Sequence, residues 1–134
     1  MIDPLLKNLK ILIVEDQTEV RMQLKDQLAE LGITQVFEAP DARMAIQLLD
    51  VAFVDYVNLI LCDWNMPCMS GLEFLRHIRE SGIQTSFMMI TGRGDQKSVI
   101  EARNYGVDGY IRKPFTSLQI EAKLRSVAHK ALAA

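Results

Sequence analysis

The sequence lacks the features of exported, membrane-spanning and nucleic-acid-binding proteins. No apolar run approaches the roughly 18 residues that a membrane-spanning helix needs. Residues 1–4 include an acid and a proline, where a secretory signal would begin with basic residues and continue into a long apolar run. The formal net charge of -2 supplies no basic field for DNA, RNA or an anionic membrane surface. We therefore expect a cytoplasmic protein that contacts neither nucleic acid nor membrane directly.

Cysteine is scarce, and its placement favours free thiols over a metal site. The chain has two cysteines, Cys62 and Cys68, and its two histidines, His77 and His129, are remote from them in the sequence. No spacing typical of zinc ligands results, and a cytoplasmic compartment keeps thiols reduced. Cys62 lies inside an apolar run and is interpreted as a small core residue.

Repeats, linkers and low-complexity tracts are also absent. The 134 residues, 49% of them hydrophobic and 24% charged, suffice for one packed core but not for two ordinary domains. We therefore expect a single soluble domain over residues 1–134, with a core from about residue 9 to residue 130.

What the sequence does contain is an alternation of short apolar runs and stretches with helical spacing. The apolar runs predict five strands, at 11–14, 36–37, 59–62, 87–90 and 110–111. Apolar residues recurring every three or four positions predict helices over about 20–31, 42–49, 72–78, 96–105 and 120–131. Glycine follows three of these helices, as is common at helix C-termini: Gly32, Gly82 and Gly106.

This alternation indicates an α/β domain with a parallel sheet. The first, third and fourth runs are apolar throughout, as in strands that are buried on both faces. The second and fifth are shorter, which suits edge strands. Right-handed crossovers would then build a doubly wound (βα)5 domain, which is a three-layer sandwich.

Polar side chains close several of these strands. Glu15 and Asp16 follow the first strand, Asp63 the third, Thr91 the fourth, and Lys113 the fifth. Ligands of such folds bind beyond the carboxyl ends of the strands, so these side chains should meet there. Three carboxylates repel one another, and one lysine cannot neutralise them. Oxygen ligands with room for water and phosphate favour Mg²⁺ over Ca²⁺, with Mn²⁺ as a substitute.

Asp63 is the best candidate nucleophile in this set. A metal ion beside it would orient its carboxylate and neutralise charge on an incoming phosphoryl group, so that an aspartyl phosphate forms. Thr91 offers a hydroxyl donor and Lys113 a positive charge for the phosphoryl oxygens. Taken singly, each residue has an ordinary explanation as a helix cap, a turn residue or a solvated side chain. The hypothesis therefore depends on the whole set.

These segments resemble the receiver domains of two-component response regulators, and especially the stand-alone chemotaxis regulators, from about residue 9 to residue 127. The matching motifs are ILIVED at 11–16, LCDWNMP at 61–67, MSG at 69–71, ITG at 90–92 and GYIRKPF at 109–115. The resemblance implies a flavodoxin-like fold with five parallel strands in the order 2-1-3-4-5.

The resemblance also implies a role for each residue of the metal site. Asp63 would be the phosphoacceptor. Mg²⁺ would be bound by the side chains of Asp16 and Asp63, by the backbone carbonyl of Asn65, and through water by Glu15. In many members of the family the first acid is Asp, so Glu15 is a departure from the pattern.

Further roles are implied beside the metal. Thr91 and Lys113 would bind the phosphoryl group, and the Lys113–Pro114 peptide would be cis. Tyr110 matches the switch aromatic whose rotamer follows the movement of Thr91, although an ordinary edge-strand aromatic would fit the sequence equally well. The positions that tune loss of the phosphoryl group are Asn65 and Arg93. The lifetime of the phosphorylated form does not transfer, because the loop at 92–95 departs from the chemotaxis pattern.

The implied function is a phospho-switch and not an enzyme, apart from self-phosphorylation from small phosphodonors and self-dephosphorylation. A histidine kinase or phosphotransfer protein would donate the phosphoryl group. The face built from the fourth helix, fifth strand and fifth helix would then bind a downstream protein target, in a chemotaxis or motility pathway. The chain would be a monomer or a weak phosphorylation-dependent dimer.

Three alternatives remain open on the sequence. An aspartate-nucleophile phosphatase has a second acid two residues after the nucleophile, whereas this chain has Asn65. A flavin carrier needs a hydroxyl-rich loop after the first strand, whereas residues 15–17 would repel a phosphate. The third alternative is a receiver domain of a larger regulator with a DNA-binding or enzymatic output, although a sequence ending just after the fifth helix makes a stand-alone protein the simpler interpretation.

Candidate partner contacts are Arg21, Lys25, Tyr105, Arg112 and Gln119.

Overall fold

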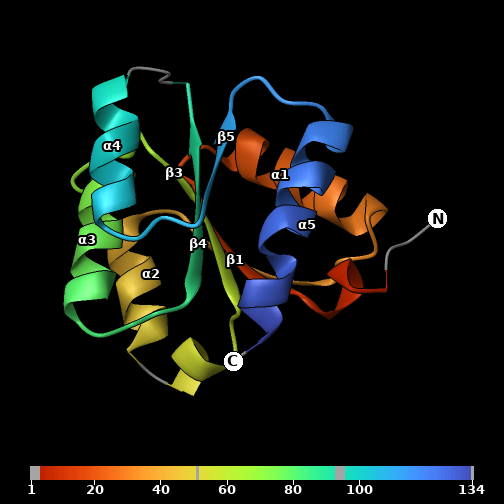
Figure 1. The fold of residues 1–134 in the computed structure, drawn as a ribbon, viewed down its shortest axis with the longest axis horizontal. Helices are drawn as coiled ribbons and strands as arrows, with labels where there is room; N and C mark the ends of the chain where they lie inside the picture. The colour runs from red at the N-terminus through yellow and green to blue at the C-terminus, as the bar shows by residue number, and fades with distance from the viewer. Residues whose placement is uncertain (1–3, 51, 93–95, 134) are drawn as a thin grey trace.

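The computed structural model describes residues 4–50, 52–92 and 96–133, in which strands and helices alternate as predicted (Figure 1). The strands are β1 (Lys10–Val14), β2 (Gln35–Ala39), β3 (Leu59–Asp63), β4 (Ser86–Thr91) and β5 (Gly109–Arg112). The α-helices are α1 (Thr18–Glu30), α2 (Ala42–Leu49), α3 (Gly71–Glu80), α4 (Gln96–Asn104) and α5 (Ser117–Leu132). Two short 3-10 helices, η1 (Leu6–Asn8) and η2 (Ala52–Asp55), precede β1 and β3.

The strands form one parallel sheet in the order β2-β1-β3-β4-β5, which confirms the predicted flavodoxin-like fold. Helices α1 and α5 cover one face, and α2, α3 and α4 cover the other (Figure 1). Successive strand residues pack on opposite faces: Ile11 and Ile13 lie in the cluster under α1 and α5, whereas Leu12 and Val14 lie in the cluster on the other side. The domain therefore has three layers and a core on each face of the sheet.

The edge strand β2 is longer than its apolar run. It extends from Gln35 to Ala39 because its backbone pairs with β1 along its whole length, including at the polar residues Gln35 and Glu38. Backbone pairing does not require apolar side chains, so an edge strand can extend beyond the segment that hydrophobicity marks. The central strand β3 is fully buried, and within it Cys62 is a free thiol in the core, as predicted.

Several helix ends follow rules that are visible in the sequence. Gly32, Gly82 and Gly106 have positive φ angles of 85°, 85° and 80°, as expected for glycines that terminate helices. Helix α3 begins with a capping box between Ser70 and Glu73. None of the helices in the described part of the chain combines the length and the apolar character required to cross a membrane.

Candidate functional site

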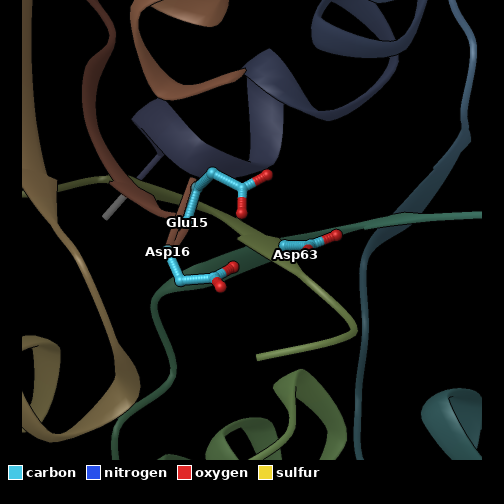
Figure 2. A group of neighbouring side chains, drawn as sticks. All are labelled: Glu15, Asp16 and Asp63. Carbon is cyan, nitrogen blue, oxygen red and sulfur yellow. The ribbon is translucent and has the colours of Figure 1, made fainter. Parts of the chain in front are cut away.

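Three carboxylates lie beside one another at the carboxyl end of the sheet. Glu15 and Asp16 occupy the turn after β1, and Asp63 is the last residue of β3 (Figure 2). Val14 of β1 pairs with Cys62 of β3, so the two neighbouring strands end at the same level. One carboxylate oxygen from each acid lies within 4.8 Å of the others. The fold thus brings together the three acids that the sequence analysis selected.

Lys113 is the cation of this cluster. Its Nζ lies 2.9 Å from Oδ1 of Asp63 and 3.4 Å from Oε1 of Glu15. Its backbone N–H donates to the carbonyl of Thr91 at 2.8 Å, and the Lys113–Pro114 peptide is cis, as the resemblance implied. Burial alone would lower the pKa of Lys113, but the hydrogen bonds and charges of Asp63 and Glu15 outweigh it and raise that pKa. The lysine is therefore held as a cation.

One lysine does not compensate the acids. Glu15 is only 2% exposed. Burial, the charge of Asp63 and a hydrogen bond with Asp16 raise the pKa of Glu15 to about 7, although the N–H of Gln17 and the charge of Lys113 oppose this rise. A cluster with uncompensated negative charge and oxygen donors suits a hard divalent cation with several water ligands. The residues present therefore fit Mg²⁺.

Thr91 and Tyr110 lie on the side of the site that faces α4. Thr91 is buried at the end of β4, and Tyr110 is half-buried on β5. The ring of Tyr110 stacks on Trp64, with centroids 6.3 Å apart, and its hydroxyl donates to the carbonyl of Ser98 on α4 at 3.1 Å. Trp64 directly follows Asp63, so Tyr110 links the end of β3 to α4.

A groove of about 570 Å³ lies between α4, β5 and α5. Thr91 and Tyr110 are among the residues that line it. Three basic side chains also line it, one from each of these elements: Arg103, Arg112 and Lys123. Thr91 therefore lies in the wall of this groove and at the end of β4, the strand that pairs with β3, whose last residue is Asp63.

The β3–α3 loop contributes the remaining predicted ligand. Asn65 lies in it, two residues beyond Asp63, and is exposed. Its backbone carbonyl stays a predicted ligand. The other position predicted to tune loss of the phosphoryl group, Arg93, lies outside the described residues.

Gly71, which the sequence analysis named only as part of the MSG motif, is a structural requirement of the site. A Cβ atom at this position would lie 2.4 Å from the carbonyl oxygen of Asp63 and 2.9 Å from Sδ of Met89. The N–H of Gly71 also donates to the carbonyl of Trp64 at 2.8 Å. Glycine is needed here because the start of α3 approaches the backbone of β3 closely. The sequence did contain a signal for this role. Glycine is not needed to cap the start of a helix, so a glycine at that position indicates a close approach to another part of the chain.

Comparison with known proteins places the chain in a family. The model of the response regulator receiver domain matches residues 11–125. The chain belongs to the receiver-domain family. Chemotaxis protein CheY-3 of Vibrio cholerae is 39% identical over 123 residues, which span 90% of this chain and 92% of that protein. Chemotaxis protein CheY of Pseudomonas aeruginosa is 36% identical over 121 residues, spanning 89% of this chain and 95% of that one.

Solved structures agree with this assignment. The structure of Vibrio cholerae chemotaxis protein CheY4 superposes with a TM-score of 0.80 at 28% identity, and the match covers 89% of this chain and 98% of that one. The protein is therefore a receiver domain of phosphoacceptor signalling in two-component systems, a class of signalling proteins and not of classical enzymes. Receiver domains use Mg²⁺ at an acidic pocket, and they interact with histidine kinases or phosphotransfer proteins and with downstream targets.

Proposed function

We propose that this receiver is a chemotaxis-type phospho-switch in which Asp63 accepts the phosphoryl group. The observation that carries the proposal is the contact of Lys113 with Asp63 at 2.9 Å, beside two further acids, at the carboxyl end of a buried parallel strand. The chemotaxis proteins of Vibrio cholerae and Pseudomonas aeruginosa match this chain over most of both lengths, which supports the pathway. The proposal includes a cytoplasmic location and a single domain over residues 1–134.

In the proposed reaction, a carboxylate oxygen of Asp63 attacks the phosphorus of a phosphohistidine on the partner kinase or phosphotransfer protein. The new O–P bond forms as the N–P bond breaks, and the imidazole leaves with that electron pair. Lys113 donates to one phosphoryl oxygen and Thr91 to another. The side chains of Asp16 and Asp63, the carbonyl of Asn65 and, through water, Glu15 would hold Mg²⁺. When bound, this ion neutralises charge on the transferred group.

The output would come from the groove between α4, β5 and α5. Thr91 ends the strand next to β3 and lines this groove, and the hydroxyl of Tyr110 donates to the carbonyl of Ser98 on α4. Binding of a phosphoryl group by Thr91 would shift the equilibrium between two rotamer states of Tyr110. The free energy of this shift cannot exceed the difference between the phosphoryl group's interactions with the two states. A downstream protein that binds one state of the groove would then respond to phosphorylation.

The decisive experiment is phosphorylation from a small donor. Incubation of the wild type with acetyl phosphate and Mg²⁺ should give a phosphorylated species in intact-mass spectra, and Asp63→Asn should give none because the nucleophilic oxygen is lost. Asp26→Asn, which changes an exposed aspartate on α1, serves as the matched control and should be phosphorylated like the wild type. An unchanged yield in Asp63→Asn would overturn the assignment, as would a wild type that needs no Mg²⁺.

A further inference from the structure

Arg21 contacts the backbone of the acidic turn from the first turns of α1. Its Nη1 donates to the carbonyl oxygen of Glu15 at 2.8 Å, and its Nε donates to Oε1 of Glu38 at 3.0 Å. The side chain is only 16% exposed. The planar guanidinium suits two acceptors in fixed directions, so it links the turn after β1 to the edge strand β2.

Glu38 is itself held in place. Nζ of Lys25, one helical turn further along α1, donates to Oε2 of Glu38 at 3.0 Å. The hydrogen bond from Lys25 lowers the pKa of Glu38; burial opposes this, but the hydrogen bond from Arg21 and the charges of both cations add to the lowering, so the pKa is lowered overall. Glu38 therefore stays ionised and provides Arg21 with a charged anchor on β2.

The peptide groups around Glu15 are consequently fixed on both sides. The N–H of Glu15 donates to the carbonyl of Ala39 at 3.1 Å, and its carbonyl accepts from Arg21. Because a peptide group is planar, fixing the Glu15 carbonyl also fixes where the Cα atom of Asp16 lies. The turn carries two carboxylates that are repelled by Asp63, so it needs a restraint of this kind while the cation is absent.

We propose that Arg21 is a positioning residue, which holds the peptide between Glu15 and Asp16 so that both carboxylates stay beside Asp63 in the geometry that Mg²⁺ needs. This inference rests on the proposed function of the site. It also gives Arg21 a role other than the partner contact that the sequence suggested, because two of its donors already have acceptors within the domain.

Charge and geometry predict opposite signs for the effect of removing Arg21. Loss of a positive charge near a cation site should, by Coulomb attraction alone, strengthen binding of Mg²⁺. Loss of the restraint on the turn should weaken it. Lys25→Ala is the matched control for the charge effect, since Lys25 lies on the same helix, carries the same charge and contacts the same Glu38, whereas Arg21 is the one of the two that donates to the carbonyl of Glu15.

The test is a titration of the metal-free full chain with Mg²⁺. Calorimetry and the fluorescence of Trp64 both report binding. Trp64 is the single tryptophan of the chain, is buried, and directly follows Asp63. Arg21→Ala should raise the dissociation constant for Mg²⁺ by about tenfold, as is typical when a residue that orients metal ligands is removed. Lys25→Ala leaves both hydrogen bonds of Arg21 in place, so it should change this constant far less. Circular dichroism at the titration temperature should show each variant folded.

Two further variants keep the test independent of folding. Arg21→Lys retains the charge but cannot reach both acceptors with one planar fork, so it should also weaken Mg²⁺ binding. Glu38→Gln removes the charged anchor and leaves the contact between Arg21 and Glu15, so it should weaken binding less than Arg21→Ala does. With acetyl phosphate, Arg21→Ala should be phosphorylated slowly at low Mg²⁺ and at the wild-type rate at saturating Mg²⁺.

The outcomes separate this inference from the function on which it rests. If the wild type binds Mg²⁺ and is phosphorylated on Asp63, but Arg21→Ala and Lys25→Ala have equal dissociation constants, the positioning role is wrong and the proposed function stands. A rate defect in Arg21→Ala that persists at saturating Mg²⁺ would also overturn it. If the wild type neither binds Mg²⁺ nor is phosphorylated, both proposals fail.

Discussion

The two ends of the sheet each contain an acid whose side chain is largely inaccessible to solvent, Asp108 at one end and Glu15 at the other, and the surroundings of these acids differ. At the amino end, Asp108 precedes β5 and accepts the N–H of Phe87 at 2.8 Å. It also forms ion pairs with Arg79, at 3.4 Å, and with Lys130. At the carboxyl end, Glu15 and Asp63 share Lys113, and Asp16 adds a third negative charge. Among the described residues, one end thus has two cations for one acid, and the other has one cation for three acids.

This difference separates a structural cluster from a functional one. Arg79 extends the amino-end cluster by donating to the carbonyl oxygens of Ile83, Thr85 and Gly106 at 2.9, 2.8 and 3.0 Å. It therefore links the loop between α3 and β4 to the loop between α4 and β5. At the carboxyl end, the residues that the structure describes offer the three acids Lys113 alone as a salt-bridge partner. Sites that are built to bind a charged ligand commonly cost stability when the ligand is absent.

The largest expected effect comes from removing the compensated acid. Asp108→Ala should destabilise the domain by about 3 kcal/mol, because it leaves the buried N–H of Phe87 without its acceptor and Arg79 without its counter-charge. Urea denaturation in metal-free buffer measures this loss. Asp16→Ala, at the other end, should cost nothing or stabilise the protein, since it removes repulsion among the acids. Equal losses in the two variants would contradict the distinction between the clusters.

A smaller effect should appear in the pH dependence of stability. Burial and the charge of Asp63 raise the pKa of Glu15 to about 7 from its ordinary value of 4.5. The folded chain therefore holds this proton longer than the unfolded chain. The corresponding stability is fully present below pH 4.5 and is lost as the pH rises through about 7. Relative to Glu15→Gln, the metal-free wild type should lose at most about 3 kcal/mol over this window.

Urea denaturation of both proteins with a chelator present, at about pH 5 and about pH 8, measures this difference. Glu38→Gln is the control, and its difference from the wild type should be the same at both pH values. The pKa of Glu38 is lowered from its ordinary value of 4.5 by Lys25 and Arg21, so its contribution to stability is lost only on acidification below that value. A pH-independent difference between the wild type and Glu15→Gln would show that the acid at the carboxyl end is compensated after all.

The smallest expected effect concerns the outer cation of the amino-end cluster. The side chain of Lys130 is 68% exposed, whereas that of Arg79 is 12% exposed. Lys130→Ala should therefore cost less than about 1 kcal/mol in urea denaturation, and the loss should shrink at high salt, as for other exposed ion pairs. If Lys130→Ala lost as much unfolding free energy as Asp108→Ala, the ion pair with Lys130, and not the one with Arg79, would stabilise the cluster most.

Much of the fold was predictable because local patterns report burial directly. The continuous apolar runs of β1, β3 and β4 required strands buried on both faces, and they placed Cys62 in the core. The extent of β2 was underestimated, since its pairing with β1 includes polar residues that carry no hydrophobic signal. The strand order came from the family resemblance and not from periodicity, because several orders satisfy the same pattern of elements.

The candidate site was predictable to a similar degree. The carboxyl ends of parallel strands meet at one edge, so the acids that follow β1 and β3 had to be neighbours. Arg21 and Asp108 could not be found in this way. A charged residue on a helix or before a strand is usually solvated, and nothing in the local sequence distinguishes one whose partners come from distant elements.

By itself, the sequence determined the succession of strands and helices along the chain and the set of polar residues at the strand ends, because these depend on spacing between neighbours in the chain. Only the tertiary structure decided which buried acid is compensated. Lys113 lies 98 residues from Glu15 and 2.9 Å from Asp63, and the balance of charge at either end of the sheet depends on such distances through space. Asp63 is therefore marked by its motif, but the excess of negative charge around it is a property of the folded chain.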